Sequence, residues 1–212
     1  MNKSEHNIIY EELLKERIIF LSGEITDATA HAIMAKLLYL DSIDNEDIKL
    51  IINSPGGSVT SGLAMYDIIN YIKSDVQTIG VGSISSMAAI LLISGTKGKR
   101  RLFSNAEVML HEVSAGIGGK YDDLVIAAKQ VEKSHKKLSE IIIDKGGLIL
   151  SEYIIGTKPE KKNFPERNRI ISGIANGVVV VEAKEKSGSL ITVDFALEQG
   201  RDVYAVPRKY YK

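Results

Sequence analysis

Two side chains in this sequence have the chemistry of a nucleophile and its base. Ser86 lies where a turn from a strand would expose it at the start of a helix. At such a position the first backbone N–H groups lack intrahelical partners and the helix dipole is positive. A serine hydroxyl also needs a base within hydrogen-bond reach, usually a histidine. His111 follows a short apolar run and is the candidate base.

The oxyanion formed by such an attack needs preorganised hydrogen-bond donors. The N–H of Met87 and an N–H of the Gly56-Gly57 loop are the candidate donors. Glycine suits this loop because the missing Cβ lets the backbone approach a substrate closely. From spacing alone, the more frequent role of a serine such as Ser86 is only to cap a helix. It also lacks the G-x-S-x-G nucleophile elbow, which disfavours an α/β-hydrolase.

Alternating strands and helices are predicted to position these residues. Short apolar runs predict buried strands over 17–21, 48–52, 78–82 and 107–110. Apolar residues at helical spacing predict helices over 58–72, from about 86, and over 121–143. A further helix should bury Ala30, Ile33, Met34, Leu37 and Leu38, with Thr26 or Asp27 as its N-cap.

This alternation implies parallel strands with right-handed crossovers, and therefore an α/β layered fold. Parallel sheets carry their chemistry at the carboxyl ends of the strands. Three such ends carry suggestive residues, namely the 53–57 loop, the 83–87 turn and His111. We therefore expect them to converge on one site.

The composition excludes several other classes. The 212 residues, 44% hydrophobic and 25% charged, fit one large globular domain, or one domain with a fragment. Equal numbers of basic and acidic residues, 27 each, leave no chain-wide basic field. The absence of cysteine excludes disulfides, thiolate metal sites and a cysteine nucleophile. The longest apolar stretch, 88–93, is too short to span a bilayer, and the N-terminus lacks a signal-peptide pattern, so we expect a cytoplasmic protein.

The chain carries four separated motifs in a fixed order: LKERIIFL at 14–21, INSPGGSV at 52–59, SSMAA at 85–89 and MLHE at 109–112. Together they resemble the ClpP family, the proteolytic subunits of the ATP-dependent Clp protease, over about residues 9–146. The resemblance implies a crotonase-like α/β fold, a serine peptidase for unfolded polypeptides, stacked heptameric rings and an AAA+ unfoldase partner. It implies no metal and no cofactor.

By position in these motifs, Ser86 matches the nucleophile of the family and His111 its base. Gly57 and Met87 match the oxyanion donors, and the predicted helix 121–143 matches the handle through which two rings interdigitate. These roles are expectations from the resemblance.

The chain departs from the family after a compositional break near residue 146. In ClpP the acid that orients the histidine follows the handle, in an Arg-Asp-x-x-hydrophobic stretch. Here the chain has SEY at 151–153, NFPERNRIISG at 163–173, SGSLIT at 187–192 and ALEQGR at 196–201. These motifs resemble the C-terminal part of the Rossmann-like domain of DprA, a DNA-processing protein that binds single-stranded DNA.

The sequence therefore indicates two family fragments, a ClpP-like peptidase domain over 1–146 and a partial Rossmann-like, DprA-like segment over 147–212. The glycine-rich first half of the DprA domain is missing, so strand 178–181 is expected to expose an edge unless it pairs with the main sheet.

Loss of the acid weakens the predicted peptidase, since in one well-studied triad that change costs about 10⁴-fold in turnover. Glu160 lies 49 residues beyond His111, close to the family's spacing, although a loop glutamate is usually only a solvated charge. Asp194 is a weaker candidate, on a predicted helix 192–199 with Leu197 facing inward. Neither is assigned as the third catalytic residue.

Three alternatives stay open beside the peptidase. A ring-forming scaffold would keep the fold without proteolysis. A single-stranded-DNA-binding module would use the basic stretch 158–169, with Phe164 and Tyr153 as stacking rings. A crotonase-fold acyl-thioester enzyme would use the glycine loop but would have no need of the Ser86–His111 pair.

Overall fold

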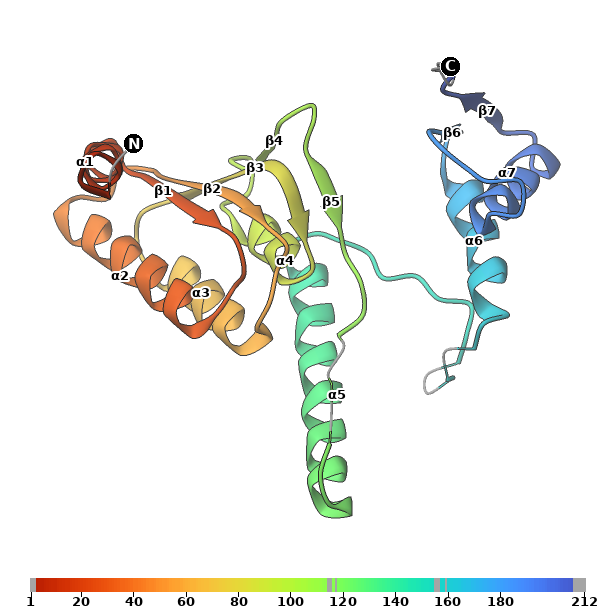
Figure 1. The fold of residues 1–212 in the computed structure, drawn as a ribbon, viewed down its shortest axis with the longest axis horizontal. Coiled ribbons are helices and arrows are strands. Elements are labelled where there is room, and N and C mark those ends of the chain that lie inside the picture. The colour runs from red at the N-terminus through yellow and green to blue at the C-terminus, as the bar shows by residue number, and fades with distance from the viewer. Residues whose placement is uncertain (1–2, 114–115, 117, 155–156, 159, 208–212) are drawn as a thin grey trace. The chain divides into compact units, whose positions relative to one another are not determined.

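The computed structural model describes residues 3–113, 116, 118–154, 157, 158 and 160–207. Contacts between residues divide the chain into two compact units, Met1–Leu150 and Ser151–Lys212. Both units alternate strands with helices (Figure 1). The predicted α/β class with parallel strands is confirmed.

The first unit is built on a sheet of five parallel strands. The strands are β1 (Ile18–Ser22), β2 (Ile48–Ser54), β3 (Val76–Ser85), β4 (Arg101–Leu102) and β5 (Glu107–Met109). The sheet order is β1-β2-β3-β4, and β5 pairs with the later part of β3. Three crossover helices connect successive strands: α2 (Asp27–Ile43), α3 (Val59–Tyr71) and α4 (Met87–Ser94). The four predicted strands are present, and β4 is an addition to them.

The register of the sheet brings three strand ends side by side. Ser54 near the end of β2 pairs with Ile84, and Ser85 at the end of β3 pairs with Met109 at the end of β5. The segments that follow these strands therefore leave the sheet at one edge. Because all the strands are parallel, this edge is formed by carboxyl ends, where the sequence places the candidate site.

Buried side chains at every second position of the strands and at helical spacing along the helices form the core of this unit. In β2, the buried side chains of Ile48, Leu50 and Ile52 alternate with more exposed ones. Helix α2 begins after Thr26, whose side chain accepts a hydrogen bond from the Thr29 N–H. Its buried residues are Ala30, Ile33, Leu37 and Leu40. The prediction was wrong for Leu38, which is 41% exposed, because Leu40 lies on the inward face instead.

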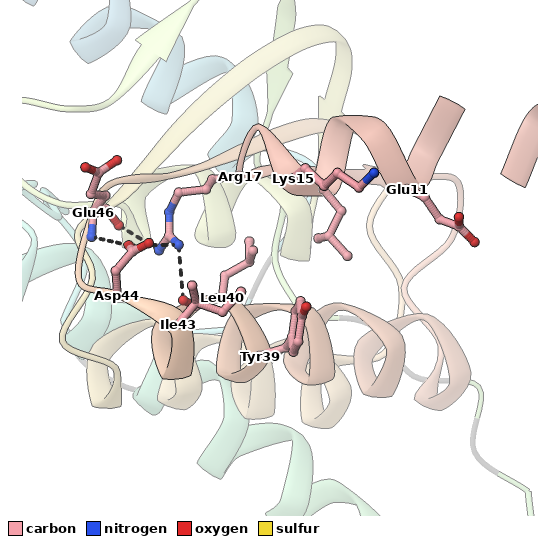
Figure 2. A pocket seen from close by; sticks show the side chains of 9 residues that line it. Glu11, Lys15, Arg17, Tyr39, Leu40, Ile43, Asp44 and Glu46 are labelled. Atoms are coloured by element: carbon pink, nitrogen blue, oxygen red, sulfur yellow. Dashed lines mark hydrogen bonds and ion pairs between the residues drawn. The ribbon is translucent and has the colours of Figure 1, made fainter. Parts of the chain in front are cut away.

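Arg17 was predicted to begin the first strand. In the structure it lies just before β1 and has a left-handed backbone (φ 58°). Its buried guanidinium forms an ion pair with Asp44 at 3.0 Å and donates hydrogen bonds to the carbonyl oxygens of Leu40 and Glu46 and to the Ser74 hydroxyl. Arg17, Leu40, Asp44 and Glu46 line a pocket of about 490 Å³. Figure 2 shows these four residues among those that line it. The pocket lies between α2 and an N-terminal helix, α1 (Lys3–Lys15), that was not predicted.

Helix α5 (Tyr121–Asp144) agrees with the predicted long helix to within one residue. Within the first unit it extends away from the sheet (Figure 1), and its buried residues are Ser134 and Ile141. Lys145 secures its C-terminal end, because its Nζ donates to the Ser94 carbonyl oxygen and to Asn70 Oδ1. Burial lowers the pKa of Lys145, and the nearby Arg100 lowers it further.

The second unit contains α6 (Asn163–Ile174), β6 (Gly177–Val180), α7 (Gly188–Glu198) and β7 (Asp202–Ala205). Strands β6 and β7 form a two-stranded parallel sheet of their own, and in the described residues β6 has no other strand partner. Helix α7 begins before the predicted 192 because the Ser187 side chain caps it. Leu197 was expected to face inward but is 60% exposed, while Ala196 is fully buried where α7 packs against α6.

Candidate active site

Ser86 occupies a strained turn between β3 and α4. Its backbone has φ 56° and ψ −124°, a conformation that non-glycine residues adopt only when their surroundings impose it, at a cost of about 1–3 kcal/mol. The Ser86 N–H donates to the Met109 carbonyl oxygen at 2.8 Å, which connects this turn to the end of β5. Although Ser86 stands at the N-cap position, its side chain makes no capping hydrogen bond. The half-buried hydroxyl is therefore available for other chemistry.

The glycine loop after β2 lies directly against this turn. A Cβ on Gly56 would stand 2.5 Å from the Ser85 carbonyl oxygen and 2.7 Å from Ser86 Cβ, so a larger residue would push the loop away. Gly57 has φ 147°, and a Cβ there would overlap the Ile25 carbonyl oxygen. Gly56 therefore allows the loop to approach the Ser86 turn, and Gly57 allows it to approach the backbone of Ile25.

Hydrogen bonds around Gly57 fix the direction of its own N–H. The Ile25 N–H donates to the Gly56 carbonyl oxygen, and the Ser58 N–H donates to the Ile25 carbonyl oxygen, both at 2.8 Å. In this parallel bridge the flanking residues make the bonds. Within the described residues, the Gly57 N–H has no hydrogen-bond partner. Met87 is the first residue of α4, so its N–H is one of the unpaired N–H groups of that helix end.

His111 follows β5, two residues beyond the carbonyl that accepts the Ser86 N–H. Its Nδ1 lies 2.6 Å from the carbonyl oxygen of the next residue, Glu112. The Glu112 carboxylate in turn lies 3.9 Å from Nε2 of His135 on α5. His111 is exposed to solvent on one side, and Val113 beyond it is half-buried.

One pocket of about 260 Å³ brings all four predicted site residues together. Ser86, His111, Gly57 and Met87 line it, with mainly apolar neighbours: Pro55, Val59, Ile90, Leu110, Val113 and Leu138. This pocket is smaller than the one beside Arg17, yet all four residues that the sequence singled out line it.

The two carboxylates considered as third catalytic residues belong to the second unit. Glu160 is exposed and forms an ion pair with Lys162 at 2.8 Å. Asp194 is exposed on α7. In the part of the chain that the structure describes, no three His, Asp or Glu side chains are grouped closely enough to hold a metal ion.

Much of the basic stretch 158–169 interacts within the second unit. Arg169 forms a two-pronged ion pair with Glu152, at 2.5 and 2.6 Å, and the guanidinium of Arg167 lies 5.6 Å from the Phe164 ring centre. The Tyr153 hydroxyl donates to the Glu166 carboxylate. These contacts occupy groups that nucleic-acid binding would need. None of the helices in the described residues is long and apolar enough to cross a membrane.

Sequence reasoning did not identify Glu112 or Leu138 as members of this site. Leu138 had only the apolar signal of a long helix, and nothing in a sequence indicates which backbone carbonyl will meet a histidine ring. A residue that acts through its main chain cannot be identified from its side-chain type.

Comparison with known proteins shows the family of this chain. Residues 1–154 match the Clp protease family, and residues 125–212 match DNA recombination-mediator protein A. The ATP-dependent Clp protease proteolytic subunit of Ligilactobacillus salivarius (strain UCC118) is 42% identical over 180 residues, which covers 84% of this chain and 90% of that relative. Both resemblances seen in the motifs are thus confirmed, and the chain belongs to the Clp protease family.

Proposed function

We propose that this chain is a serine endopeptidase, the proteolytic subunit of an ATP-dependent Clp protease. The observation that carries the proposal is the pocket in which an uncapped Ser86 on a strained turn faces the same space as His111. Membership of the Clp protease family supports the same chemistry.

In the proposed mechanism, Ser86 Oγ attacks the carbonyl carbon of a peptide bond while His111 takes the hydroxyl proton. The N–H groups of Gly57 and Met87 donate to the oxyanion that forms. His111 then returns the proton to the departing amine, which leaves an ester on Ser86. Water hydrolyses this ester with His111 again as base, and no step requires a metal or cofactor.

The proposed assembly is a homo-oligomer of heptameric rings, stacked through α5 as the handle and fed with unfolded polypeptide by an AAA+ unfoldase. Exposed apolar side chains on α5 support a protein partner for this helix, since Tyr121 is 78% and Ile126 is 66% exposed. Light scattering of the purified chain tests the assembly, and a monomeric mass would contradict it.

We also propose that residues 1–146 form the peptidase domain and that residues 147–212 form a partial Rossmann-like, DprA-like domain, which makes the chain a chimera. The family's orienting aspartate is absent from the second segment, so the proposed peptidase is impaired relative to its relatives. Single-stranded-DNA binding is the weaker function for this segment, because its own carboxylates pair with Lys162 and Arg169.

Labelling with a serine-reactive fluorophosphonate tests the function. We expect the wild-type protein to be labelled and Ser86→Ala to lose all labelling. Ser85→Ala is the matched control, because this neighbouring hydroxyl lies 3.3 Å from that of Ser83 and does not line the pocket. An unlabelled wild-type protein that still forms a folded ring would contradict the peptidase and favour the scaffold.

A further inference from the structure

The His111 ring is held by a main-chain oxygen. Its Nδ1 lies 2.6 Å from the Glu112 carbonyl oxygen, which is the distance of a short hydrogen bond. A carbonyl oxygen has no proton to donate, so Nδ1 must carry the proton in this contact. Neutral imidazole has a single N–H, and Nε2 therefore keeps its lone pair.

This tautomer is the one that a serine-activating histidine needs. In a Ser-His-Asp triad the carboxylate accepts from Nδ1–H, so that Nε2 is free to take the serine proton. The acid performs two tasks there, since it fixes the tautomer and also stabilises the imidazolium that forms. A carbonyl oxygen can perform the first task, but it lacks the negative charge for the second.

The backbone around the ring is itself restrained. The Ser86 N–H donates to the Met109 carbonyl oxygen, which ties the turn of the nucleophile to the strand end that leads to His111. On the other side, the Glu112 carboxylate lies 3.9 Å from Nε2 of His135 on α5. The accepting carbonyl therefore follows a strand end that is hydrogen-bonded to the turn of Ser86.

Among the described residues, no carboxylate lies within ion-pair distance of the His111 ring. The carboxylate nearest in sequence, that of Glu112, lies instead beside His135.

We infer that the main-chain carbonyl of Glu112 is the orienting group of His111 and replaces the missing acid in fixing its tautomer. This inference rests on the proposed function, because a tautomer matters here only if His111 acts as the base. It makes the protein a serine peptidase whose imidazole has the correct tautomer but whose imidazolium is poorly stabilised. Acylation of Ser86 then proceeds without any carboxylate from the second unit.

Solid-state ¹⁵N NMR of the full chain labelled with ¹⁵N-histidine reads the tautomer directly, whatever the size of the assembly. The spectrum is recorded at alkaline pH, so that neutral imidazole rings are compared. His111→Gln assigns the His111 signals among the four histidines. We expect a protonated Nδ1 and an unprotonated Nε2, and a protonated Nε2 or a mixture of both forms would overturn the inference.

The variants Glu160→Gln and Asp194→Asn test whether His111 is oriented by the Glu112 carbonyl or by a carboxylate of the second unit. We expect both to keep the His111 tautomer and the wild-type rate of fluorophosphonate labelling. Loss of the tautomer, or a fall in rate toward the order of 10⁴-fold seen when a triad loses its acid, would assign the role to that carboxylate and overturn the inference. The tautomer is read without turnover, so absent labelling contradicts the proposed function, whereas the wrong tautomer contradicts this inference.

Discussion

The two units of the chain share the alternation of strand and helix but differ greatly in what they bury. In the first unit, five strands and their crossover helices enclose a continuous cluster of aliphatic side chains that includes Leu37, Leu50 and Met65, none of them measurably exposed. In the described residues of the second unit, the one buried hydrophobic residue is Ala196, and Val179 and Leu197 are each 60% exposed.

The difference shows that the alternation of strands and helices along the chain determines the class of a fold. The number of paired strands determines whether a core forms. A two-stranded sheet that packs with only two helices, α6 and α7, has too little surface to enclose aliphatic side chains. The candidate site depends on such a core, because the strained turn at Ser86 persists only where packing imposes it.

The largest expected effect is on the free energy of unfolding, when a buried side chain of the first unit and an exposed one of the second are each truncated to alanine. Leu50→Ala in β2 should lower the free energy of unfolding by about 2–5 kcal/mol, because it leaves a cavity in a closed core. Val179→Ala in β6 should change it by about 0.5 kcal/mol or less, since that side chain is largely in water. Urea unfolding followed by circular dichroism measures both, and equal effects would contradict the contrast.

The next effect concerns glycines with positive φ in the two units. Gly57→Ala should lower the rate of fluorophosphonate labelling by about 10²–10³-fold, the loss expected for one oxyanion donor, because its Cβ would overlap the Ile25 carbonyl oxygen. Gly200→Ala in the second unit is the matched control, with φ 67° and open space around it. Its labelling should stay at the wild-type rate, and a parallel loss would mean that the site also depends on the second unit.

The smallest effect comes from a half-buried ion-pair network of the first unit. A hydrogen bond from Lys99 holds the pKa of Asp47 below its ordinary 3.8, and one from Gln77 adds to it. The stability from this pair is present above pH 3.8 and is lost as the pH falls through the lower folded value.

Lys99 also forms an ion pair with Asp75, at 2.8 Å. Lys99→Met should therefore lower the melting temperature slightly at neutral pH, far less than Leu50→Ala, and not at all once Asp47 and Asp75 are both protonated. Thermal melts across this pH range measure the change. A deficit that persists in acid would show that Lys99 acts through packing and not through charge.

Most elements of the first unit were predictable because their signals are local. The strands and helices differ from the predictions by a few residues at their ends, and the positive φ of Arg17 explains why β1 starts one residue late. Helix α6 was not foreseen because Pro165 and its polar neighbours resemble a loop, although proline is tolerated in the first turn of a helix.

The site was predictable to the extent that chemistry resides in side chains. Ser86, His111 and Met87 were found from type and position, Gly57 was singled out within its loop by the family resemblance, and all four line one pocket. Their catalytic roles stay predictions. The Glu112 carbonyl could not have been found, because every residue carries such a group and only the folded backbone decides which one meets Nδ1.

Arg17 also bears on the order in which the first unit folds. Its side-chain partners lie 23 to 57 residues further along the chain, so they gather around the guanidinium only after α2 and the start of β3 are in place. Such contacts carry a large loop-closure cost and form late. The contacts of Arg17 therefore form after the folding nucleus and stabilise the completed fold. Arg17→Met should speed unfolding while the folding rate stays nearly the same.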